Sequence, residues 1–366
     1  MRIAILTLPL HTNYGGILQA YALQTVLERM GHEVKVLSRP PYKAHNAWVM
    51  PIVYLKRVIQ KVFLRQDISI LYDGHNRIRQ NTDKFIRKYI HSHIVTDWGK
   101  LEGQFDAYVV GSDQIWRPKY AKMFSDIPNA FLSFTEGWDI KRIAYAVSFG
   151  TDEWEYSDSL TNLCKQLVRS FDRISVRENC GIRLCKEHLE VDATHVLDPT
   201  MLLSKNDYLA LINAARKKKH EGGIMCYILD STAYTREIIN HYERVLLLQA
   251  FHTNSLIENP DAREKDKIQK PVEHWLQSFC DADFVITDSF HACVFSIIFR
   301  INFAVIINEG RGSSRIYSLL ETTGLQDRII RDREEMPLQS INYDNVYSKL
   351  NKVKQESMAF IQETLS

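Results

Sequence analysis

The sequence predicts an α/β fold with two Rossmann-like domains that face a cleft. Short, nearly continuous apolar runs, typical of buried parallel strands, alternate with segments of helical periodicity. The alternation occurs in two consecutive stretches of similar size, and 366 residues leave room for two ordinary domains. We therefore expect an N-terminal domain over residues 1–200 and a C-terminal domain over residues 201–366.

The first stretch begins with the order of elements that opens a doubly wound domain. It predicts a strand, a loop with two glycines, a helix and a second strand, at residues 2–8, 11–16, 17–30 and 33–37. Later strands, each followed by a polar or glycine-containing loop, are expected at residues 107–110, 142–147, 173–176 and 195–197.

The second stretch repeats this alternation. Its strands are expected at residues 224–229, 244–249, 284–286 and 303–306, and its helices at residues 233–243, 271–281 and 289–299. A last helix over residues 343–364 could pack back across the joint between the domains.

Residues 43–100 interrupt the alternation of predicted strands and helices, and we expect them to form a helical insertion in the N-terminal domain. Its first helix, over residues 48–65, is apolar with several basic residues and could lie on a membrane surface. We favour a helix that packs on its own domain, because a basic face is usually just solvated. A second helix is expected over residues 76–89.

Composition excludes several classes of protein. Lys and Arg number 46 and Asp and Glu 44, and a formal charge of +2 argues against a protein that coats nucleic acid. No run of 18 apolar residues predicts a transmembrane helix, and the first residues lack the pattern of a signal peptide. The six cysteines form no C-x-x-C pair, which disfavours disulfides or a zinc site. We expect a cytoplasmic protein without a metal.

Ligands of open α/β sheets bind at the carboxyl ends of the strands, so polar residues after the predicted strands are the site candidates. Asn13, Gly15 and Gly16 follow the first strand, where backbone N–H groups could hold a phosphate or carboxylate. A tight turn that needs glycine is the alternative. The segment is not G-x-G-x-x-G, and no P-loop lysine follows.

A second candidate follows the strand at residues 107–110. Ser112, Asp113 and Gln114 offer hydrogen-bond donors and acceptors beside Trp116, a combination that suits a sugar ring. In the alternative, Asp113 caps the next helix and Trp116 fills the core. We favour the sugar site.

Basic residues follow three further strands. Arg177 presents a fork of donors suited to carboxylate or phosphate, although an ion pair is the usual fate of arginine. His291 lies in the first turn of a helix that Ser289 would cap, where the helix dipole favours a neutral ring able to act as a general base. A capping histidine with no chemistry is the alternative. Arg311 and Arg315 predict an anion-binding loop, or else a flexible surface loop.

These motifs together resemble the polysaccharide pyruvyl transferase family. The matching segments occur in the order of that family, at residues 13–20, 111–116, 144–150, 175–178, 197–200 and 287–291, within a resemblance over about residues 1–330. The resemblance implies a two-domain fold like that of GT-B glycosyltransferases. It also implies transfer of a pyruvyl group from phosphoenolpyruvate to two hydroxyls of a sugar, which gives a cyclic ketal without a metal or nicotinamide cofactor.

The resemblance further implies roles for the site residues. His291 falls on the proton carrier, and Arg177 and Arg315 fall on a clamp for the donor, with Arg311 competing with Arg315. The other donor-binding residues expected are Ser289, Asn13, Gly15 and Gly16, and those expected at the acceptor sugar are Ser112, Asp113, Gln114 and Trp116. The acceptor would be a surface polysaccharide or exopolysaccharide, or its lipid-linked precursor.

Two other functions stay open. A GT-B glycosyltransferase with a nucleotide-sugar donor would need a ribose-binding acid in the C-terminal domain, and Glu309 is the candidate. A non-catalytic carbohydrate-binding member would not need the basic residues that this chain retains. Because lipid-linked glycans are built at the inner membrane face, residues 48–65 could touch the bilayer there.

Overall fold

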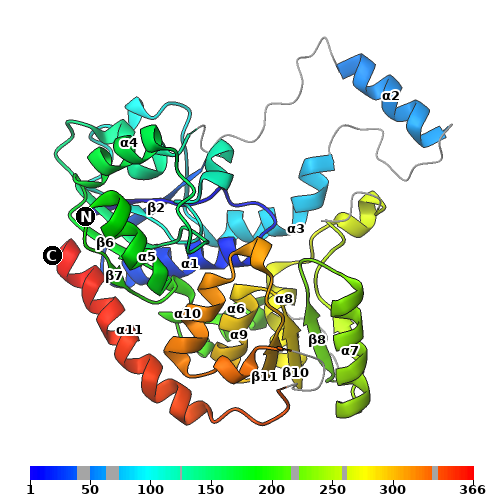
Figure 1. Ribbon diagram of the computed structural model, residues 1–366. Helices are drawn as coiled ribbons and strands as arrows, with labels where there is room; N and C mark the ends of the chain where they lie inside the picture. The colour runs from blue at the N-terminus through cyan, green and yellow to red at the C-terminus, as the bar shows by residue number, and fades with distance from the viewer. Residues whose placement is uncertain (39–49, 63–73, 124–125, 216–221, 258–261, 332–336) are drawn as a thin grey trace.

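Two parallel sheets, each flanked by helices, form the framework of the protein (Figure 1). They are seen in a computed structural model that describes residues 1–38, 50–62, 74–123, 126–215, 222–257, 262–331 and 337–366. The α/β architecture with two Rossmann-like sheets is therefore confirmed. The domain boundary near residue 200 stays a prediction.

The first sheet has seven strands, in the order β3-β2-β1-β4-β5-β6-β7. Its central strands are buried on both faces, which is why they appear in the sequence as nearly continuous apolar runs. The strands are β1 (Arg2–Leu6), β2 (Glu33–Ser38), β3 (Ser92–Ile94), β4 (Ala107–Val110), β5 (Lys141–Val147), β6 (Arg173–Val176) and β7 (Thr194–His195). The helices of this half are α1 (Tyr14–Arg29), α2 (Met50–Val62), α3 (Gly74–Tyr89), α4 (Asp158–Val168) and α5 (Asn179–Leu184).

The second sheet has four strands, in the order β11-β10-β8-β9. They are β8 (Ile224–Tyr227), β9 (Ala250–His252), β10 (Phe284–Thr287) and β11 (Asn302–Val305). The helices are α6 (Lys205–Ala215), α7 (Ala233–Leu246), α8 (Val272–Asp281), α9 (Phe290–Phe299), α10 (Ser314–Thr323) and α11 (Tyr343–Leu365). Every residue of α9 is buried, as expected of a helix that is hydrophobic all round.

Two expectations about strands were wrong. The strand expected at residues 244–249 is the end of α7 and a turn, because Leu247 has a φ of 55°, which ends the helix, and β9 begins only at Ala250. The insertion at residues 43–100 was expected to be helical, yet it also contains β3, which pairs with β2 at the sheet edge. A strand of three residues carries too little apolar pattern to be seen in a sequence.

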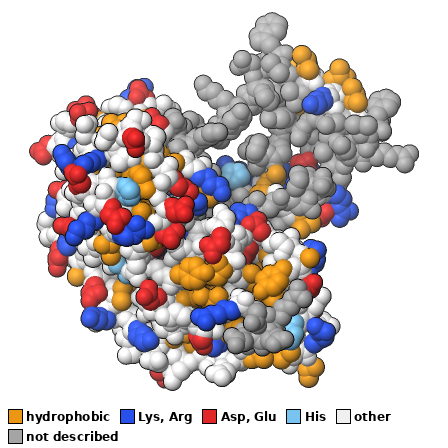
Figure 2. Space-filling view, in the orientation of Figure 1, with side chains coloured by type: hydrophobic (Ala, Val, Ile, Leu, Met, Phe, Trp, Pro, Cys, Tyr) orange, Lys and Arg blue, Asp and Glu red, His pale blue; other side chains and the backbone are white. Residues whose placement is uncertain are grey.

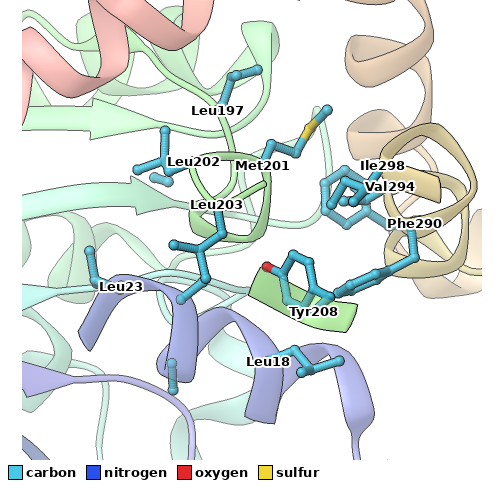
Figure 3. Close-up of a cluster of buried hydrophobic side chains, with 14 of the residues drawn as sticks. Leu18, Leu23, Leu197, Met201, Leu202, Leu203, Tyr208, Phe290, Val294 and Ile298 are labelled. Carbon is cyan, nitrogen blue, oxygen red and sulfur yellow. The ribbon is translucent and has the colours of Figure 1, made fainter. Parts of the chain in front are cut away.

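One hydrophobic core joins the two halves. Figure 3 shows Leu18 of α1 near Tyr208 of α6, with Phe290 of α9 on the other side. The Tyr208 hydroxyl donates to the carbonyl of Thr200, 2.8 Å away. This packing holds α1 of the first half against α9 of the second, and so positions the first turns of both helices.

The C-terminal helix α11 connects the same two halves. Near its start, the Tyr343 hydroxyl donates to the carbonyl of Ile301, beside β11. Near its end, the carbonyl of Thr364 accepts from the Lys141 ammonium of β5 at 2.9 Å. The helix therefore runs from the second sheet back to the first (Figure 1).

Helix α2 has three exposed apolar residues. Ile52, Leu55 and Ile59 are 69%, 63% and 44% exposed. The favoured interpretation, in which this helix packs on its own domain, was wrong for these residues. Residues 48–49 and 63–65 of the expected helix lie outside the described residues. No described helix has the length and apolar character needed to cross a membrane.

Candidate active site

A large polar cavity lies between the two sheets. Its volume is about 670 Å³, and most residues that line it come from the loops and first helical turns that follow β1, β4, β8, β9, β10 and β11. Parallel strands present their carboxyl ends at one edge, so residues far apart in the sequence meet there. Asn13 and Asp113 come from the first half, whereas Asp230, His291 and Arg315 come from the second.

The His291 ring is wedged between elements of the first half. It is 6% exposed and lines the cavity. A Cβ atom at Gly15 would lie 2.0 Å from its Nδ1, so α1 approaches the ring closely. Its Nε2 is 3.7 Å from Oδ2 of Asp198 and has no hydrogen-bond partner among the described residues. The imidazole therefore faces a carboxylate, as a group that carries a proton would.

Asp198, which follows β7, is buried and surrounded by donors. Its Oδ1 accepts from the backbone N–H and hydroxyl of Thr200, at 3.0 and 2.6 Å. Its Oδ2 accepts from Nη1 of Arg177 at 2.6 Å and from the Ser112 hydroxyl at 3.3 Å. Burial raises the pKa of the Asp198 carboxyl, but interactions with His291, Arg177 and Thr200 outweigh burial and hold that pKa well below its usual range. Asp198 is therefore ionised at neutral pH.

Two buried arginines share a second carboxylate. Oδ1 of Asp113 is 3.3 Å from Nη2 of Arg177 and 3.5 Å from Nη1 of Arg315. Both guanidinium groups also lie near the ring of Phe290, at 4.5 and 5.6 Å from its centroid. Each guanidinium of this cluster lies next to a carboxylate, so opposite charges compensate one another and the group can remain buried.

The charges of this cluster influence one another's protonation. Burial raises the pKa of Asp113, but Arg177, His291 and Arg315 lower it more, so the net shift is downward. Burial and repulsion from Arg177 lower the pKa of Arg315 to about 10. Both groups therefore keep their charge at neutral pH.

Arg311 lies on the cavity wall in a two-point ion pair. Its Nε and Nη2 donate to Asp230, at 2.9 and 2.6 Å. The hydrogen bond from Arg311 lowers the pKa of Asp230 to about 2. The neighbouring Asp288 accepts from the backbone N–H groups of Leu229 and Asp230, which ties the end of β8 to the end of β10. The guanidinium of Arg311 is therefore already paired with the carboxylate of Asp230.

Most of the predicted site residues meet at this cavity. Those that line it are Asn13, Gly15, Asp113, Gln114, Ser289, His291, Arg311 and Arg315. Arg177 does not line the cavity but lies behind it, joined to its wall through Asp113. Ser289 occupies the N-cap position of α9, but its side chain makes no capping hydrogen bond.

Besides Arg177, three predicted residues stay outside the lining: Gly16, Ser112 and Trp116. The expected contact between Trp116 and a sugar was wrong, because the ring is fully buried and stacks on Phe131 with centroids 4.4 Å apart. Its indole N–H donates to the carbonyl of Ala130 at 3.0 Å. Ser112 instead supports Asp198, and the N–H of Gly16 donates to the capping side chain of Asn13 at 3.2 Å.

Sequence reasoning gave no role to Asp198, Asp230 or Phe290. Both aspartates stand directly after an expected strand, and that position is the signal that could have found them. In the sequence, Phe290 cannot be distinguished from the other apolar residues of a buried helix. Only the tertiary structure places its ring beside two arginines.

Gly15→Ala tests the close approach of α1 to His291. The new Cβ would lie 2.0 Å from Nδ1 and 2.3 Å from Cγ of the ring, so the imidazole or the helix must move. We expect a loss of about 1–3 kcal/mol in the free energy of unfolding, measured with urea. Gly16→Ala is the matched control, since its Cβ would meet no atom closer than 3.6 Å. Equal unfolding midpoints for the two variants would contradict the observed packing.

The fold and the cavity define a class of α/β proteins in which two parallel sheets bring the carboxyl ends of their strands to one polar site. The comparison with protein families shows to which family within this class the chain belongs. A model described as polysaccharide pyruvyl transferase matches residues 13–310. The chain belongs to the polysaccharide pyruvyl transferase family and is thus a transferase.

Solved structures with a similar arrangement are remote in sequence. A glycosyltransferase from Rickettsia africae is 10% identical, with a TM-score of 0.48 over 100% of this chain and 99% of that chain. The UDP-GlcNAc 2-epimerase from Neisseria meningitidis, bound to UDP-GlcNAc, is also 10% identical, with a TM-score of 0.46 and the same coverage. A search of curated proteins gives no match. Likenesses of this strength say nothing about donor or acceptor.

Proposed function

We propose that the protein transfers a pyruvyl group from phosphoenolpyruvate to two hydroxyls of a sugar, which closes a cyclic ketal. The sugar would belong to a surface polysaccharide or exopolysaccharide, or to its lipid-linked precursor. The observation that carries the proposal is the meeting of His291, Asp113 and Arg315 on one cavity wall, in a chain of this family.

The charges of the cavity support an anionic donor. Phosphoenolpyruvate carries about three negative charges, on a carboxylate and a phosphate. Arg311 already meets Asp230 at two points, whereas Arg315 donates to the carbonyls of Arg311 and Gly312 and shares Asp113 with Arg177. Carbonyl oxygens do not neutralise a guanidinium, so Arg315 keeps more of its charge for a ligand. We assign the donor clamp to Arg315, with Arg177 supporting it from behind through Asp113.

The proposed reaction needs protons to move in both directions. A proton added to C3 of phosphoenolpyruvate generates an oxocarbenium-like centre at C2. One sugar hydroxyl attacks this centre, phosphate leaves, and a second hydroxyl closes the ketal. Of the two hydroxyl protons that the sugar loses, one is balanced by the proton that makes C3 a methyl group, and the other leaves with phosphate. His291 lies at the cavity beside an ionised Asp198, which suits it to carry these protons.

The acceptor would lie beside the donor in the same cavity. A volume of about 670 Å³ is within the range of small-molecule sites and exceeds what a three-carbon acid phosphate needs. Asp113 and Gln114 remain the proposed acceptor contacts on the side of the first sheet. Trp116 has no part in this proposal.

Phosphate release with a panel of sugar acceptors tests the function. Purified protein is incubated with phosphoenolpyruvate and nitrophenyl or lipid-linked sugars, while phosphate and the ketal methyl signal are followed by NMR. We expect both signals to rise together with at least one sugar. Turnover of a nucleotide sugar without any use of phosphoenolpyruvate would overturn the proposal.

The nucleotide-sugar alternative depended on Glu309 as the ribose-binding acid. This side chain is exposed, does not line the cavity, and accepts a hydrogen bond from Ser313. The structure thus offers no support for that role of Glu309, and we favour the phosphoenolpyruvate donor.

A further inference from the structure

We propose that α2 docks the protein on an anionic lipid surface through the apolar face formed by Ile52, Leu55 and Ile59. The inference does not depend on the proposed function, because it rests on a helix outside the cavity. It assigns a partner to a surface that the described residues leave exposed.

The three side chains form one stripe along the helix. Positions separated by three and four residues lie on the same face of an α-helix, and these three follow that spacing. Their exposures of 69%, 63% and 44% are high for large apolar residues that stand next to one another. Figure 2 shows orange side chains with a blue one among them at the upper right, where Figure 1 places α2. Such a patch marks an interaction site in a soluble protein.

The charged residues of α2 indicate which kind of lipid surface it would bind. The sequence of α2 contains Lys56, Arg57 and Lys61 and no acidic residue. Lys56 is exposed beside the apolar stripe. A helix with an exposed apolar stripe, an exposed lysine beside it and no acidic residue in its sequence suits anionic headgroups, which attract positive charge while the apolar side chains enter the acyl boundary.

Length decides how the helix would lie. The 13 residues of α2 extend about 20 Å, which is shorter than the roughly 30 Å of a bilayer core. The helix cannot span the membrane and would rest in the plane of the interface. Docking there would leave both sheets and the cavity in water.

Vesicle co-sedimentation of the full chain tests the proposal. The vesicles are phosphatidylcholine alone, or phosphatidylcholine with one third phosphatidylglycerol. We expect binding to the anionic vesicles at low salt and a marked loss at high salt, because exposed charges are screened. Replacing the stripe (Ile52→Ser, Leu55→Ser and Ile59→Ser together) should lower the partition coefficient at least about tenfold.

Two controls separate docking from general stickiness. Leu163→Ser removes a partly exposed leucine from α4, 42% exposed, and should leave vesicle binding unchanged. Lys56→Glu should weaken binding to anionic vesicles only. Unfolding midpoints equal to that of the wild type show that each variant folds. Wild-type protein that ignores anionic vesicles, or a triple variant that binds as well as the wild type, would overturn the proposal. So would a dimer in solution that the triple substitution converts to a monomer without any vesicle binding.

Discussion

His291→Ala is expected to slow phosphate release from phosphoenolpyruvate by about 10²–10⁴-fold, the range that a positioned proton carrier contributes. The physical reason is the position of the ring, which lines the cavity while its Nε2 faces the ionised Asp198 at 3.7 Å. Binding of phosphoenolpyruvate should survive, since the clamp is assigned to Arg315. The rate is measured by phosphate release, and binding by the rise in melting temperature that the ligand produces.

His91→Ala is the matched control for that experiment. The His91 imidazole is exposed, contacts Glu28 and lies outside the cavity, so turnover should not change. A rate close to that of the wild type for His291→Ala would remove the histidine from the mechanism. Loss of the phosphoenolpyruvate thermal shift in that variant would instead place His291 in donor binding.

Arg177→Met is expected to lower the free energy of unfolding by about 3–5 kcal/mol, because it removes the cation from two buried carboxylates. Arg177 is 2.6 Å from Asp198 and 3.3 Å from Asp113, and the three side chains are at most 5% exposed. Methionine fills similar space but cannot compensate either charge. Urea unfolding at neutral pH measures the change.

Arg2→Met provides a comparison for this substitution. Arg2 pairs with Asp106 at 2.6 Å, but the two side chains are 49% and 39% exposed, so solvent replaces the lost partner. Its unfolding midpoint should remain close to that of the wild type. An Arg177→Met protein as stable as Arg2→Met would show that the buried cluster does not need its central cation.

The stabilisation from this cluster should depend on pH in one direction. The pKa values of Asp113 and Asp198 are lower in the folded protein than in the unfolded chain, where they are about 4. Their contribution is present above pH 4 and is lost as the pH falls toward the folded values. The difference in stability between wild type and Arg177→Met should therefore shrink below about pH 4, and a difference that grows would contradict the assignment.

Much of the fold could be predicted because buried parallel strands leave a strong local signal. The runs at β1, β4 and β10 are apolar on both faces, and each ends at a polar loop. Position after a strand then predicted that His291, Arg311 and Arg315 lie near one another, since parallel topology collects such positions at one edge, and all three line the cavity. Strands β3 and β9 have only three residues each, and the signal was too short to place them.

Contacts between segments far apart in the sequence could not be predicted from these local patterns. Trp116 beside polar residues looked like a sugar platform, but its neighbour Phe131 covers the ring. An aromatic ring next to donors has the same sequence pattern whether its face is open or covered. The burial of α2 likewise depends on whether another element meets its apolar face, and in the described residues that face is exposed.

The sequence by itself determined the α/β class and the family, because periodicity and strand-end motifs are local properties. It also proposed His291, Arg177, Arg311 and Arg315 as candidates for the chemistry. Tertiary structure alone decided which side chains lie together. It placed Asp198 opposite His291, put Phe290 beside two arginines, and moved Arg177 behind the cavity wall. Asp198 and His291 are 93 residues apart in the sequence, and Arg177 and Phe290 are 113 apart. They meet only because the two sheets pack so that the ends of their strands lie together.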